Sequence, residues 1–142
     1  MGLQVILNGR YIKSTDLENF FGFRNIITYS RLDGTETTRD GNRVQAAIDY
    51  AEDYVDDRLR NGPYVIPLPQ APSALKTIID IVVRIAGVWL YQSRGVRDDD
   101  ENDKMQAHRD RAEEMLNMIL SGQMKLDAPR TGTQPTAMVI VV

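Results

Sequence analysis

The stretch from residue 73 to residue 93 constrains the fold more than any other part of the chain, because as a helix it is apolar around most of its circumference. Its apolar residues cannot share one face; they are Leu75, Ile78, Ile79, Val82, Val83, Ile85, Ala86, Trp89 and Leu90. Lys76, Asp80 and Arg84 follow at four-residue steps and form one narrow polar seam of ion pairs. These charges argue against a membrane helix. The segment therefore predicts a central helix that other elements surround.

Three further helices are predicted around it. Apolar residues at three- and four-residue steps predict helices over residues 42–60 and 103–121. Thr15 and Glu18 have the spacing of a capping box, which starts a short helix that Gly22 ends. The stretch between residues 23 and 42 is rich in turn signals and is predicted as a loop.

The two ends of the chain favour β-structure. Residues 4–7 and 10–13 are short β-favouring runs that flank Asn8-Gly9, a dipeptide typical of a type I′ hairpin. After Leu126 the residues Pro129, Gly132 and Pro135 break any regular element, and a strand-prone apolar run follows. The expected fold is mainly α: a small four-helix domain with an N-terminal β-hairpin and an extended, β-prone C-terminal tail. One domain spans residues 1–126, with residues 1–14 as the hairpin extension, and residues 127–142 form the arm.

Both ends present more apolar, strand-prone surface than four helices can cover, so they are candidates for contact with another polypeptide. The candidate contact residues are Val5, Leu7 and Tyr11 in the hairpin, and Met138, Val139, Ile140 and Val141 in the tail. Pairing with a neighbouring subunit and a disordered tail are both compatible with this composition.

Acidic residues gather in two places. The helix over residues 42–60 carries Asp49, Glu52, Asp53, Asp56 and Asp57, and the run before the last helix carries Asp98, Asp99 and Asp100. The run resembles the start of a calcium-binding loop, but Asp103 replaces the required glycine and Arg109 the required bidentate glutamate, so calcium is excluded. Each group is either a solvated face or an acidic surface that meets a basic neighbour or lines a DNA channel.

No pattern in the chain predicts catalysis. His108 is the only histidine, cysteine is absent, and no phosphate-binding glycine loop occurs, so neither a metal nor a nucleophile–base site is expected, and His108 is expected to face solvent. The net charge of −3 gives no electrostatic basis for tight nucleic-acid binding. The sequence predicts a non-enzymatic protein without cofactors.

The order of motifs resembles a known family. Asp16-Leu17 and Gly22 come first, then a helix ending in Val55 and Leu59, then Tyr64-Val65-Ile66-Pro67-Leu68, Pro72, Leu75 and Asp80-Ile81, and last residues 112–122 with Leu126. Over residues 15–126 this order resembles the head–tail connector (adaptor, or head-completion) proteins of tailed bacteriophages. The hairpin, the Asn61-Gly62-Pro63 insertion and the long tail depart from the usual pattern.

The resemblance implies a structural virion protein of the neck, assembled in the host cytoplasm. Its copies would form a ring, dodecameric by the resemblance, docked to the portal protein and to tail or neck proteins. DNA would pass through without specific binding, and no membrane is involved. The alternatives are a phage-encoded helical nucleic-acid-binding regulator, which would need a basic recognition helix, and a small hydrolase, which would need a convergent pocket of titratable groups.

Overall fold

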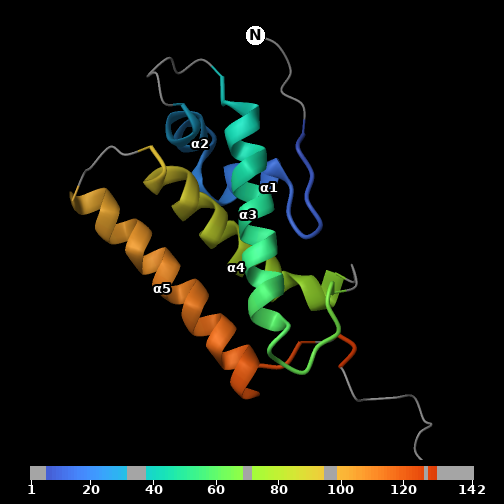
Figure 1. The fold of residues 1–142 in the computed structure, drawn as a ribbon. Coiled ribbons are helices and arrows are strands. Elements are labelled where there is room, and N and C mark those ends of the chain that lie inside the picture. Colours follow the sequence, from blue (N-terminus) through green and yellow to red (C-terminus); the bar gives the residue numbers. More distant parts are fainter. Residues whose placement is uncertain (1–5, 32–37, 69–71, 95–98, 127, 131–142) are drawn as a thin grey trace, which may run out of the picture.

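The structure is a computed structural model that describes residues 6–31, 38–68, 72–94, 99–126 and 128–130, with the backbone alone at residues 72–75 and 99. Five helices follow one another along the chain: α1 (Ser14–Phe21), α2 (Phe23–Ser30), α3 (Gly41–Leu59), α4 (Pro72–Gln92) and α5 (Asp99–Ser121). Figure 1 shows α3 crossing α4 and α5 running beside α4, with α1 and α2 in the upper part of the view.

Helix α4 packs against all four other helices, as its apolar circumference predicts. Ile78, Ile81, Val82, Ile85 and Ala86 are all fully buried within it. A helix that is apolar on nearly all sides is stable in water only when its neighbours cover it. The core of the molecule is therefore the surface of α4.

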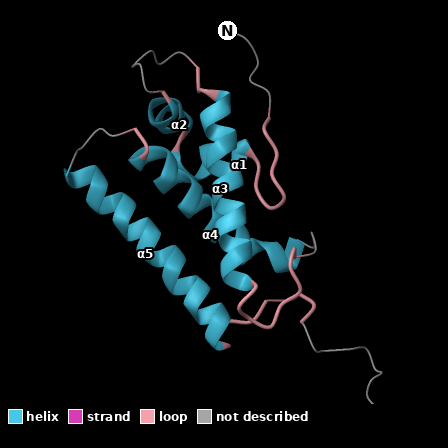
Figure 2. Ribbon diagram, in the orientation of Figure 1, coloured by secondary structure: helices cyan, strands magenta, loops and turns pink. Residues whose placement is uncertain are grey.

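The predicted combination of four helices and β-extensions is wrong, because the described residues contain five helices and no β-strand (Figure 2). The segment expected to be a hairpin closes with a single antiparallel bridge between Asn8 and Lys13. Among the described glycines, a positive φ occurs at Gly22 and Gly122, so Gly9 does not supply the type I′ turn. The tail from residue 131 onward lies outside the described residues.

The stretch after Gly22 forms helix α2 and not the predicted loop. Gly22, with φ of 100°, ends α1 and at once precedes α2, so the glycine redirects the chain without interrupting helical structure. Ile26, Ile27 and Tyr29 of α2 are buried, and the Tyr29 hydroxyl donates to Glu101 of α5 at 3.0 Å. Tertiary burial makes so short a helix stable.

Helix α5 begins at Asp99, four residues before the predicted start, so most of the acidic run belongs to the first turn of a helix. Carboxylates are favourable there because the helix dipole places partial positive charge at its N-terminus. The acidic run thus has a local structural role.

A polar cluster fastens α3 to α5. Tyr54 and Arg58 of α3 donate to the two carboxylate oxygens of Glu113, and Arg109 donates to the same group at 3.1 Å. Burial opposes ionisation, but the hydrogen bonds from Tyr54 and Arg58 outweigh it and hold the pKa of Glu113 below its usual value. This cluster complements the apolar contacts that both helices make with α4.

Gly87 allows α1 to pack closely on α4. A Cβ at this position would lie 2.1 Å from Cε2 of Phe21, so an alanine would push the ring out of its site. We expect Gly87→Ala to lower the free energy of unfolding by about 1–3 kcal/mol through overpacking, measured by urea denaturation.

Gly41→Ala is the matched control for that substitution. Its Cβ would make an ordinary contact of 3.9 Å with Leu7, and we expect no loss of stability there. Equal effects of the two substitutions would contradict the close packing at Gly87.

Candidate functional site

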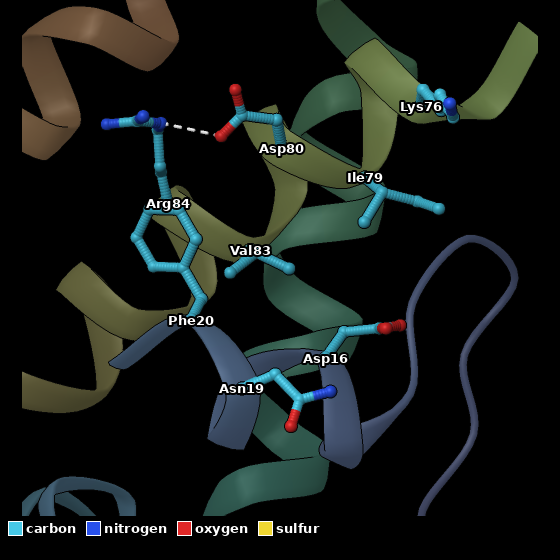
Figure 3. Close-up of a pocket in the computed structure, with 8 residues that line it drawn as sticks. All are labelled: Asp16, Asn19, Phe20, Lys76, Ile79, Asp80, Val83 and Arg84. Atoms are coloured by element: carbon cyan, nitrogen blue, oxygen red, sulfur yellow. Dashed lines mark hydrogen bonds and ion pairs between the residues drawn. The ribbon is translucent and has the colours of Figure 1, made fainter. Parts of the chain in front are cut away.

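A groove of about 470 Å³ lies between α1 and α4 (Figure 3). We call it the α1–α4 groove. Phe20, Ile79 and Val83 supply its apolar surface. Its polar lining residues are Asp16, Asn19, Lys76, Asp80 and Arg84.

Helical periodicity places these residues in the groove. On α4 the lining residues follow at steps of three and one from residue 76 to residue 84, which is a single stripe of a 3.6-residue helix. On α1, Leu17 is fully buried and Phe21 packs against Gly87, so Asp16, Asn19 and Phe20 face the groove. The groove lies where short α1 leaves part of α4 uncovered.

Arg84 organises one wall of the groove. Its Nε donates to Asp80 Oδ1 at 2.8 Å, as the sequence predicts, and its guanidinium lies 5.1 Å from the centre of the Phe20 ring. Its Nη1 lies 3.0 Å from His108 Nδ1. Arg84 thus fixes the exposed ring of Phe20 against α4.

His108 does not face solvent as expected. It is half-buried, with its ring centre 5.4 Å from that of Phe20 and 5.3 Å from that of Phe21. Burial, together with the positive charge of Arg84, lowers the pKa of His108. A neutral imidazole can accept the hydrogen bond from Arg84. His108 therefore helps to hold Arg84 and Phe20 in the groove wall.

The groove has the composition of a docking site. Its apolar surface meets a rim that carries both signs of charge, and Asp80 and Arg84 already neutralise each other. Nowhere in the described part of the chain do three or more histidine, aspartate or glutamate side chains lie close enough to hold a metal ion. The arrangement is suited to receiving side chains of another segment.

Sequence reasoning missed the aromatic residues of this region. Phe20 is 40% exposed and Phe23 is 47% exposed, although both are large and apolar. The sequence contains a signal for exposed aromatic rings here. Three phenylalanines fall within residues 20–23, and successive helical positions cannot all face one core. Exposed aromatic side chains are enriched at protein interfaces.

The acidic residues of α3 form two rows and not one face. Asp49, Asp53 and Asp57 are exposed, whereas Glu52 and Asp56 are only 1% and 3% exposed. The helical repeat separates the rows, because residues 52 and 56 share the side of α3 that the N-terminal loop covers. Glu52 and Asp56 are therefore not available to a DNA channel or a partner.

The Glu52 carboxylate binds the N-terminal loop. Its oxygens accept hydrogen bonds from the backbone N–H groups of Arg10, Tyr11 and Ile12 at 2.9, 2.7 and 3.1 Å. Three successive N–H groups around one anion satisfy a charge that would otherwise be costly to bury. Gly9 permits this approach, since a Cβ there would lie 2.2 Å from Glu52 Oε2. Because these three N–H groups already donate to Glu52, they cannot donate to a second strand, and the expected hairpin ladder does not form.

Asp56 completes the attachment. Its Oδ1 accepts from the Tyr11 hydroxyl at 2.6 Å, and that hydroxyl accepts from the backbone N–H of Leu68 at 3.0 Å. Arg10 donates to Asp56 and to Asp53 at 3.0 and 2.9 Å. Tyr11 is only 5% exposed, so this predicted partner contact lies inside its own chain. Burial, followed by the hydrogen bond to Asp56, raises the pKa of Tyr11 to about 12.

The remaining predicted residues are placed as follows. Leu7 is half-buried and packs against the core, and Asp100 is exposed on the first turn of α5. Asp99 is described by its backbone, which opens α5. Val5, Asp98, Met138, Val139, Ile140 and Val141 lie outside the described residues.

Comparison with known families gives the decisive observation. Residues 11–140 match the model of the family described as Bacteriophage Mu, Gp36. The chain belongs to the bacteriophage Mu Gp36 family. It is therefore a phage protein. No curated protein matches the chain.

The family match begins at a residue that is bound to the helical domain. The bacteriophage Mu Gp36 family match begins at Tyr11, whose side chain and backbone both bind α3. It extends past the last described residue, so ten residues of the tail also belong to the family pattern. Separately, a search of the described helices for a stretch long and apolar enough to cross a membrane finds no candidate.

Replacing Glu52 tests the attachment of the N-terminal loop. In Glu52→Gln the charge is lost and an amide NH₂ meets backbone donors, so we expect the free energy of unfolding to fall by about 2–4 kcal/mol. Hydrogen exchange at the amides of residues 10–12 should accelerate. Asp49→Asn, three residues earlier and exposed, should change stability by less than about 0.5 kcal/mol.

The raised pKa of Tyr11 predicts a loss of stability in alkali. The ordinary value is 10 and the folded value is about 12, so folding favours the neutral phenol. The contribution is complete below pH 10 and is lost as the pH rises through 12, by about 2 kcal/mol at pH 12. The difference in free energy of unfolding between the wild type and Tyr11→Phe should shrink over this range. A constant difference would contradict the prediction.

Proposed function

We propose that the protein is a structural virion subunit, a head–tail connector whose copies form a ring docked to the portal protein. The ring would join the DNA-filled head to the tail. Membership of the bacteriophage Mu Gp36 family carries this proposal, together with the motif order of the helical domain. We further propose a structural role without catalysis.

The distribution of exposed apolar residues supports assembly. Phe20 lines the α1–α4 groove and the exposed Phe23 begins α2, whereas Ile6 and Val65, at 52% and 43% exposed, lie on other segments. A ring of identical subunits requires two different surfaces on each copy, because each contact joins one face to another. The subunit carries exposed apolar side chains on more than one surface, as such contacts need.

The exposed row of Asp49, Asp53 and Asp57 is suited to a surface past which DNA moves. Like charge repels the phosphate backbone, and a repelled strand slides without being held. Arg10 offsets Asp53 at 2.9 Å and Arg60 pairs with Asp57, whereas Asp49 accepts a hydrogen bond from the uncharged Gln45 at 3.0 Å and keeps its negative charge at the surface.

The test uses the purified chain, mixed with the portal protein of the same phage. We expect native mass spectrometry to detect a complex with one connector copy per portal subunit or a fixed ratio close to it. Electron microscopy should show a ring on the portal axis. A chain that remains monomeric and never joins the portal would contradict the proposal.

A second measurement separates the connector from a nucleic-acid-binding regulator. Binding to duplex DNA at low and high salt should be weak and non-specific for a connector. Tight binding to one sequence, with affinity falling steeply as salt rises, would replace the connector proposal with the regulator.

A further inference from the structure

The α1–α4 groove is open and preformed in the single subunit. The ring of Phe20 is held by Arg84 at 5.1 Å and by His108 at 5.4 Å, yet 40% of this residue remains exposed. Holding an aromatic ring in place while it is exposed reduces the cost of ordering it on binding. The groove is therefore ready to receive apolar side chains.

The size and charge of the groove define its occupant. Residues 76 and 84 lie about 12 Å apart along α4 at 1.5 Å per residue, and four or five extended residues span a similar length. Phe20 and Ile79 present apolar surface, with Val83 buried beside them, so an apolar segment suits the groove. Because Lys76 and Asp16 place opposite charges on the rim, the rim gives no net attraction to a segment of either charge.

One segment of this chain has these properties. Residues 138–142 are Met-Val-Ile-Val-Val, five apolar residues in succession without charge, and residues 131–137 before them are also uncharged. Outside the helices, this is the longest uninterrupted run of large apolar side chains in the sequence. Left in water, such a run promotes aggregation.

Pro129 and Arg130, which precede this segment in the chain, are held against the domain. The backbone N–H of Val65 donates to the carbonyl of Pro129 at 3.0 Å, and Arg130 lies 5.2 Å over the ring of Tyr64. The Tyr64 hydroxyl in turn accepts from the backbone N–H of Leu126 at 2.7 Å. Seven residues separate Arg130 from Met138, which allows a reach of roughly 25 Å from a fixed point.

We propose that residues 138–142 of one copy occupy the α1–α4 groove of a neighbouring copy. This inference rests on the proposed ring, which places copies side by side and gives each contact one donor and one receiving surface. A contact of five residues is weak alone, but tethers repeated around a ring raise the effective concentration of each segment. The groove is the receiving half of the contact between subunits.

Because the natural chain has no cysteine, only cysteines that are introduced by substitution can form disulfides in a trapping experiment. One variant carries Asn19→Cys on the exposed groove rim, and the other carries Ile140→Cys in the segment. The two are mixed, assembled on the portal protein and oxidised. We expect a disulfide-linked dimer of one copy of each variant, at least tenfold above the control pair.

The control pair replaces the groove variant with Gln106→Cys, an exposed position on α5 that does not line the groove. Circular dichroism of each variant verifies that the helices are retained. Equal trapping at residues 19 and 106 within intact rings would overturn this inference and leave the connector proposal standing. Absence of rings with the wild-type chain would instead overturn the connector proposal, and this inference with it.

A double variant, Asn19→Cys with Ile140→Cys in one chain, separates the two possible sources of the segment. Docking between copies gives linked multimers and few internally bridged monomers. A product that is mainly a bridged monomer would place the segment in the groove of its own chain and overturn the inference.

Discussion

Burial of nearly the whole circumference of α4 is the constraint on which the rest of the structure depends. Its apolar residues leave only one narrow polar seam for water, so α1, α2, α3 and α5 all contact it. The long helices α3 and α5 cover much of its surface, and α1 and α2 pack against the rest. The α1–α4 groove is the place where this covering is incomplete, and its apolar surface is a direct consequence of the way α4 is buried.

The attachment of the N-terminal loop follows a different principle. Here a buried carboxylate, Glu52, is stabilised by three backbone N–H groups, and Asp56 binds the Tyr11 hydroxyl beside it. Neither acid could be buried without these partners. The loop therefore depends on α3 for its conformation, and α3 depends on the loop to satisfy its charges. This reciprocal arrangement holds the start of the chain where the match to the phage family begins.

The functional proposals rely on surfaces and not on a reaction centre. Family membership identifies a phage protein, the exposed aromatic residues of α1 and α2 support assembly, and the apolar segment at residues 138–142 offers an occupant for the groove. Subunits that join through tethered segments can assemble stepwise, since each segment binds a preformed site. The exposed acidic row on α3 is separate from this contact, and we propose that it faces DNA.

The sequence by itself determined what depends on neighbours along the chain. The extents of α3 and α4, the central place of α4 and the ion pair between Asp80 and Arg84 follow from periodicities of three and four residues. Only the tertiary structure decided the contacts that Gly9, Tyr11 and Glu52 make. These contacts join residues about forty positions apart and override the local turn signal. The same reason explains α2 and His108: partners distant in sequence bury them, and no local pattern contains that information.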